Sequence, residues 1–129
     1  MKRVILSSKA PAPIGPYSQA IEANGTLYVS GQIPINPATG EVVAGGIEPQ
    51  TQQVMKNIKA ILEEAGYSFD QVVKTTILLD DLANFNTVNT LYGEYFPGEG
   101  APARETYQVA KLPKGVAVEI SQRDRKSVV

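Results

Sequence analysis

The sequence contains no cysteine and no histidine. The lack of cysteine excludes disulfides and a thiolate nucleophile, and the lack of both residue types excludes the common zinc sites and the histidine-based catalytic triads. An excess of one charge is also lacking, because 12 basic and 13 acidic residues leave a net charge of −1. Most familiar hydrolase chemistry is therefore excluded, and a strongly charged partner such as nucleic acid is not expected.

Long apolar segments are absent as well. The apolar start of the chain ends at Ser7, which is shorter than the roughly seven to fifteen apolar residues of a signal peptide. No stretch approaches the roughly 18 apolar residues of a membrane span. We therefore interpret the start as a first strand and expect a cytoplasmic protein. The length of 129 residues predicts a single domain spanning residues 1–129.

No metal and no other cofactor are expected. The adjacent carboxylates Asp80 and Asp81 could hold a hard cation weakly. A cap for the helix that follows is the preferred interpretation, because aspartate is a favoured N-cap residue.

The first half of the chain has the pattern of a β-meander followed by a helix. Short apolar runs over residues 4–6, 20–23 and 27–31 are separated by loops rich in proline and glycine, and Asn24-Gly25 is typical of a tight hairpin. From Pro49 the apolar residues recur with helical spacing, and Gly66 suits the position just past the helix end. The apolar helix positions are Val54, Ile58, Ile61, Leu62 and Ala65.

The second half adds a buried strand over residues 72–79, a second helix, and two strands over residues 103–109 and 116–123. The predicted apolar stripe of the second helix consists of Leu82, Phe85, Tyr92 and Phe96. The element order is therefore βββαβαββ. This order predicts an α+β fold in which both helices cover one face of a mixed sheet. Since no third helix remains for the other face, we expect this face to mediate oligomerisation, with candidate sites in the clefts between subunits.

The last two strands carry the residues that are best suited to take part in a reaction. Alternation places Arg104 and Thr106 on one face of the first strand. If the two strands form a hairpin, Thr106 faces Glu119, and Arg104 lies diagonally from Glu119 at roughly 7–8 Å between backbones. A guanidinium can orient a carboxylate substrate, and a carboxylate can activate water and return its proton to a leaving amine. An ordinary cross-strand ion pair is the alternative interpretation of this pattern.

Motifs along essentially the whole chain resemble the reactive-intermediate deaminase family, also called YjgF-like proteins, and most closely its RidA subgroup. The resemblance implies a chorismate-mutase-like fold and a homotrimer with three clefts at subunit interfaces. The second helix, with Asn89 and Tyr92, also matches. The other motifs are Ile14-Gly15-Pro16-Tyr17-Ser18-Gln19-Ala20, Ser30-Gly31-Gln32-Ile33-Pro34, Val73-Lys74-Thr75-Thr76, Pro102-Ala103-Arg104, Leu112-Pro113 and Val118-Glu119-Ile120.

The same resemblance implies roles for individual residues. Arg104 would bind the substrate carboxylate and Glu119 would position the water, with Tyr17 completing the catalytic set. Ser30, Gly31, Asn89 and Thr106 would line the substrate pocket. The position of Thr106 is commonly cysteine in the subgroup, so thiol-dependent chemistry is excluded here while hydrolysis by water remains possible.

The resulting hypothesis is cofactor-independent hydrolysis of reactive enamines and imines, namely 2-aminoacrylate and 2-imino acids, to 2-keto acids and ammonia. Its expected partners are a small imino or keto acid and two further copies of the chain, with no nucleic acid and no membrane. An alternative from another class is a non-catalytic trimer that binds small carboxylates as a regulator. RNA cleavage, which has been attached to the wider family, is disfavoured because the only basic tail, at Arg123, Arg125 and Lys126, is short and interrupted by an aspartate.

Overall fold

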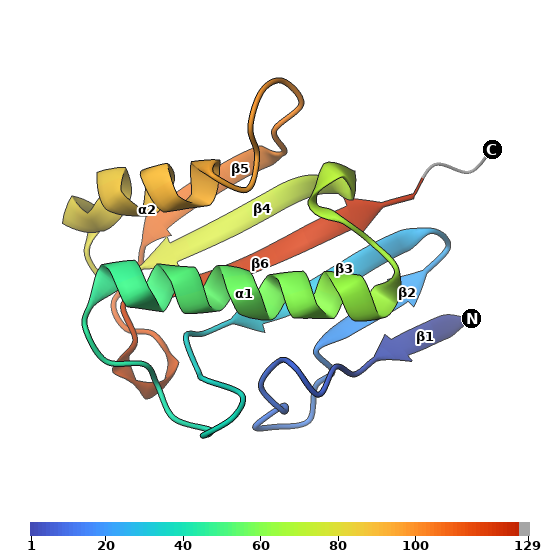
Figure 1. The fold of residues 1–129 in the computed structure, drawn as a ribbon, viewed down its shortest axis with the longest axis horizontal. Coiled ribbons are helices and arrows are strands. Elements are labelled where there is room, and N and C mark those ends of the chain that lie inside the picture. Colours follow the sequence, from blue (N-terminus) through green and yellow to red (C-terminus); the bar gives the residue numbers. More distant parts are fainter. Residues whose placement is uncertain (127–129) are drawn as a thin grey trace.

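A computed structural model describes residues 1–126. It contains one six-stranded mixed sheet with two helices on the same face, as the element order predicts (Figure 1). The strands are β1 (Lys2–Ile5), β2 (Ala20–Ala23), β3 (Thr26–Gln32), β4 (Val72–Leu79), β5 (Ala103–Gln108) and β6 (Val118–Arg125), and the helices are α1 (Ile47–Ala65) and α2 (Phe85–Gly93). Three short 3-10 helices lie at Phe69–Gln71, Leu82–Asn84 and Pro113–Gly115.

The strand order in the sheet is β1-β2-β3-β6-β4-β5. All neighbours are antiparallel except β4 and β5, which are parallel. The predicted hairpin between β5 and β6 is therefore wrong, because β4 lies between these two strands. The cause is α2: a helix that connects two strands returns the second strand parallel to the first, so β5 takes the outer side of β4. The chain then passes to the other side of β4 to form β6.

The opening meander is confirmed, with β1, β2 and β3 antiparallel in sequence order. Its tight turn has Asn24 at φ 53° and Gly25 at φ 76°, the left-handed backbone that this dipeptide tolerates. The turn fixes the register of β3, which carries two of the predicted site residues.

Helix α1 supplies the apolar layer over β3 and β6. All five predicted apolar positions are buried, and the helix ends at Ala65. Gly66 follows it with a φ of 80°, the expected left-handed C-cap. The apolar periodicity therefore gave the correct buried face and the correct end of this helix.

Helix α2 differs in detail from its prediction. It ends at Gly93, and its buried residues are Val88 and Tyr92, whereas Leu82 and Phe85 are 46% and 37% exposed. The segment before it is a 3-10 turn in which Asp81 accepts a hydrogen bond from the backbone N–H of Ala83. Asp81 is therefore an N-cap, the role predicted for the aspartate pair.

The face of the sheet opposite the helices carries exposed aromatic side chains. Tyr28 on β3 is 48% exposed and Tyr107 on β5 is 55% exposed, and Thr76 on β4 is only partly buried. Figure 1 shows both helices on the other side of the sheet. The expectation that further copies of the chain cover this face remains a prediction.

In the part of the chain that the structure describes, neither helix is long and apolar enough to cross a membrane.

Candidate functional site

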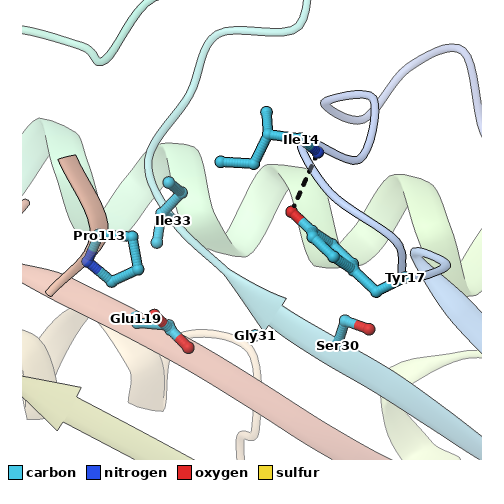
Figure 2. Close-up of a pocket in the computed structure, with 7 residues that line it drawn as sticks. All are labelled: Ile14, Tyr17, Ser30, Gly31, Ile33, Pro113 and Glu119. Carbon is cyan, nitrogen blue, oxygen red and sulfur yellow. Dashed lines mark hydrogen bonds between the residues drawn. The ribbon is translucent and has the colours of Figure 1, made fainter.

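A cavity of about 360 Å³ lies between the loop after β1, the end of β3 and the start of β6. It brings together four of the predicted site residues: Tyr17, Ser30, Gly31 and Glu119 (Figure 2). The remaining wall is apolar and consists of Ile14, Ile33 and Pro113. These three lie within the sequence motifs, but periodicity gave no signal that they line a pocket.

The hydroxyl of Tyr17 is held in a defined orientation. Its oxygen accepts a hydrogen bond of 3.2 Å from the backbone N–H of Ile14 (Figure 2). Because this bond uses a lone pair, the phenolic O–H is available to donate to a ligand. Ser30 Oγ donates to the carbonyl of Ser18 at 2.6 Å, so its lone pairs are available to accept. The two hydroxyls can therefore serve as one donor and one acceptor.

The loop that carries Tyr17 is shaped by a buried amide. The side chain of Gln19 accepts from the backbone N–H of Ser7 and donates to the carbonyls of Ser7 and Pro11. A second amide, on Asn57 of α1, donates to the carbonyl of Ile35 at 3.0 Å and so anchors the segment after β3. The sequence analysis assigned neither residue a positioning role. Asn57 could have been recognised, because it is a polar residue within the apolar face of α1.

Glycine at position 31 leaves room for the carboxylate of Glu119. A Cβ placed on Gly31 would lie 2.9 Å from Cδ and 3.2 Å from Cγ of Glu119, distances at which the two side chains clash. Gly31 does not have a positive φ, so the requirement comes from space and not from backbone conformation. The close approach places the carboxylate against β3, on the floor of the cavity.

Burial raises the pKa of Glu119 above its ordinary value of 4.5. Water around the carboxylate is partly excluded by the surrounding wall, which disfavours the charged form. No ion pair involving this residue is present within residues 1–126. A raised pKa makes the ionised carboxylate a stronger proton acceptor, and it also makes the protonated form more available as a proton donor than it is for an exposed carboxyl group.

A second cluster surrounds Arg104 on β5. Its Nη1 donates to Oδ1 of Asn89 at 2.7 Å, and its guanidinium carbon lies 5.5 Å from the ring centre of Phe85 and 5.2 Å from that of Tyr92. The Tyr92 hydroxyl donates to Oγ1 of Thr75 at 2.9 Å, inside the core. A guanidinium has five N–H donors, so those not engaged by Asn89 can bind a carboxylate.

Thr106 lies beside this second cluster. It lines a narrow crevice together with Asn89 and Arg104, and its hydroxyl is buried with no hydrogen-bond partner among residues 1–126. A buried unsatisfied hydroxyl is costly, so Thr106 is suited to a polar ligand group or to a group from another chain.

The two clusters lie on opposite faces of the sheet, so the predicted convergence of Arg104, Thr106 and Glu119 within one chain is wrong. Thr106 pairs with Ile77, which in turn pairs with Ile120, so these three side chains face the helices. Glu119 precedes Ile120 and points the other way. The error follows from the intervening β4, which the hairpin prediction omitted.

No group of three acidic residues that could hold a metal ion occurs in the described chain, residues 1–126. The two clusters described above contain hydroxyls, an amide, a carboxylate and a guanidinium.

Comparison with known proteins gives consistent matches over most of the chain. A family model described as Endoribonuclease L-PSP matches residues 7–122. A RutC family protein of Pyrococcus horikoshii is 56% identical over 93% of this chain and 94% of the relative. The 2-iminobutanoate/2-iminopropanoate deaminase of Homo sapiens is 51% identical over 93% of this chain and 87% of the relative.

Solved structures agree with these sequence matches. A crystal structure of a protein of unknown function of the conserved Rid protein family, from Yersinia pestis, superimposes with a TM-score of 0.95. It is 52% identical and covers 98% of this chain and 100% of its own chain.

Proposed function

Because this chain belongs to the reactive-intermediate deaminase family, we propose that it hydrolyses 2-aminoacrylate and 2-imino acids to 2-keto acids and ammonia. The observation that carries the proposal is the half-buried carboxylate of Glu119, which faces an otherwise largely apolar cavity containing the Tyr17 hydroxyl. Relatives named 2-iminobutanoate/2-iminopropanoate deaminase, at about half identity over most of the chain, support the same reaction class.

The reaction needs one water and no external cofactor. The substrate reacts as its protonated imine. Glu119 accepts a proton from the water as the water oxygen bonds to the carbon of the C=N group, and the nitrogen takes the electron pair of the C=N bond and becomes an amine. Glu119 then gives this proton to the amine. The C–N bond breaks as the C=O bond forms, the hydroxyl proton passes to Glu119, and the ammonia takes it up and leaves as ammonium. An enamine substrate such as 2-aminoacrylate first moves a proton to its terminal carbon and becomes the imine. Tyr17 donates a hydrogen bond to the oxygen that develops charge.

Arg104 is the proposed anchor for the substrate carboxylate. Two aromatic rings and Asn89 hold the guanidinium in place, and a fixed guanidinium loses little freedom when it binds a planar carboxylate. The carboxylate would orient the C=N carbon toward the water, a contribution from positioning.

Since Arg104 and Glu119 lie on opposite faces of the sheet, we infer that each complete site forms between two subunits. One subunit would supply Tyr17, Ser30 and Glu119, and its neighbour would supply Arg104 and the crevice beside it. The exposed sheet face offers the surface for such an assembly, and a closed homotrimer would contain three identical clefts.

The basic tail gives little support to RNA binding. Arg123 lies 5.4 Å above the ring of Tyr28, and Lys126 lies 4.6 Å above the ring of Tyr67. Both cations are engaged with the chain itself, whereas a nucleic-acid surface presents clustered cations to phosphate groups.

A coupled assay tests the proposed reaction. An amino-acid oxidase or dehydratase generates the imine, and semicarbazide traps what remains. We expect the wild-type protein to lower the trapped signal, Arg104→Ala to abolish the effect for carboxylated substrates, and Glu119→Gln to lower kcat by about 100-fold or more. Arg125→Ala and Glu41→Gln, at exposed positions, are the matched controls. Full turnover in both site variants would contradict the mechanism.

Complementation tests the shared site. Equal amounts of the Arg104→Ala and Glu119→Gln proteins are unfolded and refolded together. If the subunits mix at random, about a quarter of the clefts contain both a wild-type Arg104 and a wild-type Glu119. We therefore expect about a quarter of wild-type activity from a mixture of two inactive proteins. If both groups acted from one chain, the mixture would stay inactive.

A further inference from the structure

A second cavity, of about 320 Å³, lies between the turn before β4 and the segment that follows α2. None of its residues lines the cavity of Glu119 or the crevice of Arg104. We call it the aromatic cavity, and its lining residues are Phe69, Asp70, Tyr95, Phe96, Pro97, Glu99, Gly100 and Ala101.

Three aromatic rings form one side of the aromatic cavity. The ring centre of Phe69 lies 5.1 Å from that of Tyr95 at an interplanar angle of 51°, and 5.4 Å from that of Phe96 at 89°. The three rings thus pack against one another with inclined planes, and all three belong to the lining of the cavity. The face of an aromatic ring carries partial negative charge and attracts cations.

The polar groups of the aromatic cavity add negative charge. Asp70 and Glu99 both belong to its lining, and the lining residues described within 1–126 include no lysine or arginine. The cavity also lies just past Gly93, the last residue of α2, where the helix dipole places partial negative charge. The rings, the carboxylates and the helix end thus all favour a positively charged ligand.

From this combination we propose that the aromatic cavity binds a small organic cation with a methylated ammonium head group. Aromatic rings supply no ligand atoms for a hard metal ion, which requires oxygen atoms around it. A quaternary ammonium is weakly hydrated and can leave water for a partly apolar wall, and ring faces recognise it in other proteins. The two carboxylates, Asp70 and Glu99, add electrostatic attraction for its positive charge.

Titration of the full-length protein with choline tests the proposal, followed by backbone amide shifts in NMR spectra. We expect saturable shifts confined to residues 69–70 and 95–101. The matched ligand is 3,3-dimethyl-1-butanol, which has the shape of choline without its charge, and we expect it to bind at least tenfold more weakly. Equal binding of the neutral compound, or shifts spread over the whole surface, would overturn the proposal.

Two variants locate the site. Phe69→Leu removes one ring, and Glu99→Gln removes one carboxylate at an exposed position without disturbing the core. We expect each to weaken choline binding about three- to tenfold, while Tyr107→Leu and Glu41→Gln, outside the cavity, leave it unchanged. Unchanged binding in Glu99→Gln would contradict the proposal even if Phe69→Leu failed to fold.

A peptide with one trimethyllysine distinguishes a free cation from a modified side chain. Binding at least tenfold tighter than that of choline would overturn the assignment to a small molecule, and similar or weaker binding would support it. None of these measurements uses deaminase activity, so they stand apart from the test of the proposed reaction.

Discussion

The carboxylate of Glu119 lies over the Cα of Gly31, in the space that any larger residue at position 31 would fill. Glu119 on β6 and Gly31 on β3 thus depend on each other: the carboxylate occupies its place in the site only because position 31 has no side chain. The contact also gives the most direct test of the position of Glu119.

Replacement of Gly31 by alanine should displace this carboxylate while the strand remains intact. We expect Gly31→Ala to lower kcat by about 100-fold, the effect of moving a reacting group by roughly 1 Å, with a circular dichroism spectrum like that of the wild type. Gly93→Ala is the matched control, because a Cβ at Gly93 meets no atom within 4 Å. The control should keep full activity and gain about 0.4–1 kcal/mol in the free energy of unfolding. An active Gly31→Ala protein would argue against the role of Glu119.

The pH dependence of the reaction should report the raised pKa of Glu119. The proposed base must be ionised, so kcat/KM should fall as the pH drops through a pKa above the ordinary value of 4.5. Burial causes the rise in pKa, since it disfavours the charged carboxylate. The residual activity of Glu119→Gln should lack this acidic limb. A limb at or below pH 4.5 in the wild type would show that another group controls the reaction.

Two substitutions at Tyr92 should separate its packing role from its effect on Arg104. Tyr92→Phe keeps the ring next to the guanidinium but loses the buried bond to Thr75, so unfolding should become easier by about 0.5–1.5 kcal/mol with KM unchanged. Tyr92→Leu also removes the ring, and KM should rise about two- to fivefold. Tyr107→Phe, at an exposed position, controls for the loss of a hydroxyl. Equal KM values for both Tyr92 variants would contradict a contribution from the ring.

Asp124 should make the stability of the protein depend on pH. Its side chain is fully buried, and neither carboxylate oxygen has a hydrogen-bond partner among residues 1–126. Burial raises the pKa of Asp124 from 3.8 to about 7. The folded state therefore holds this proton more tightly than the unfolded state, so the contribution of Asp124 to stability falls as the pH rises from about 4 to about 7 and is then constant.

The matched variant is Asp124→Asn, compared with the wild type by urea unfolding at pH 5 and pH 8. We expect the variant to gain stability relative to the wild type between these two values, by on the order of 1–4 kcal/mol. Asp80→Asn, at an exposed position, should show no such change. A difference between Asp124→Asn and the wild type that is independent of pH would show that this carboxyl does not titrate in the range.

Local patterns were sufficient to predict the elements of this fold. The Asn24-Gly25 turn, the apolar face of α1 and the Gly66 cap depend on backbone preferences and on spacing within one segment, and all three are confirmed. The motifs also indicated the residues of the cavity, because residues near in sequence, such as Ser30 and Gly31, enter it together.

The pairing of strands could not be determined in the same way. Whether β6 follows β5 as a hairpin or passes to the far side of β4 depends on contacts between distant segments, and local spacing is compatible with both arrangements.

The amino-acid sequence by itself thus determined the element order, the buried face of α1 and the chemical groups available to this protein. Only the tertiary structure decided that Arg104 and Glu119 face opposite sides of the sheet, that Gly31 makes room for a carboxylate and that Asp124 is buried without a partner. The physical reason is that helix and turn preferences act over a few residues, whereas the face and the surroundings of a side chain depend on which strands lie beside its own.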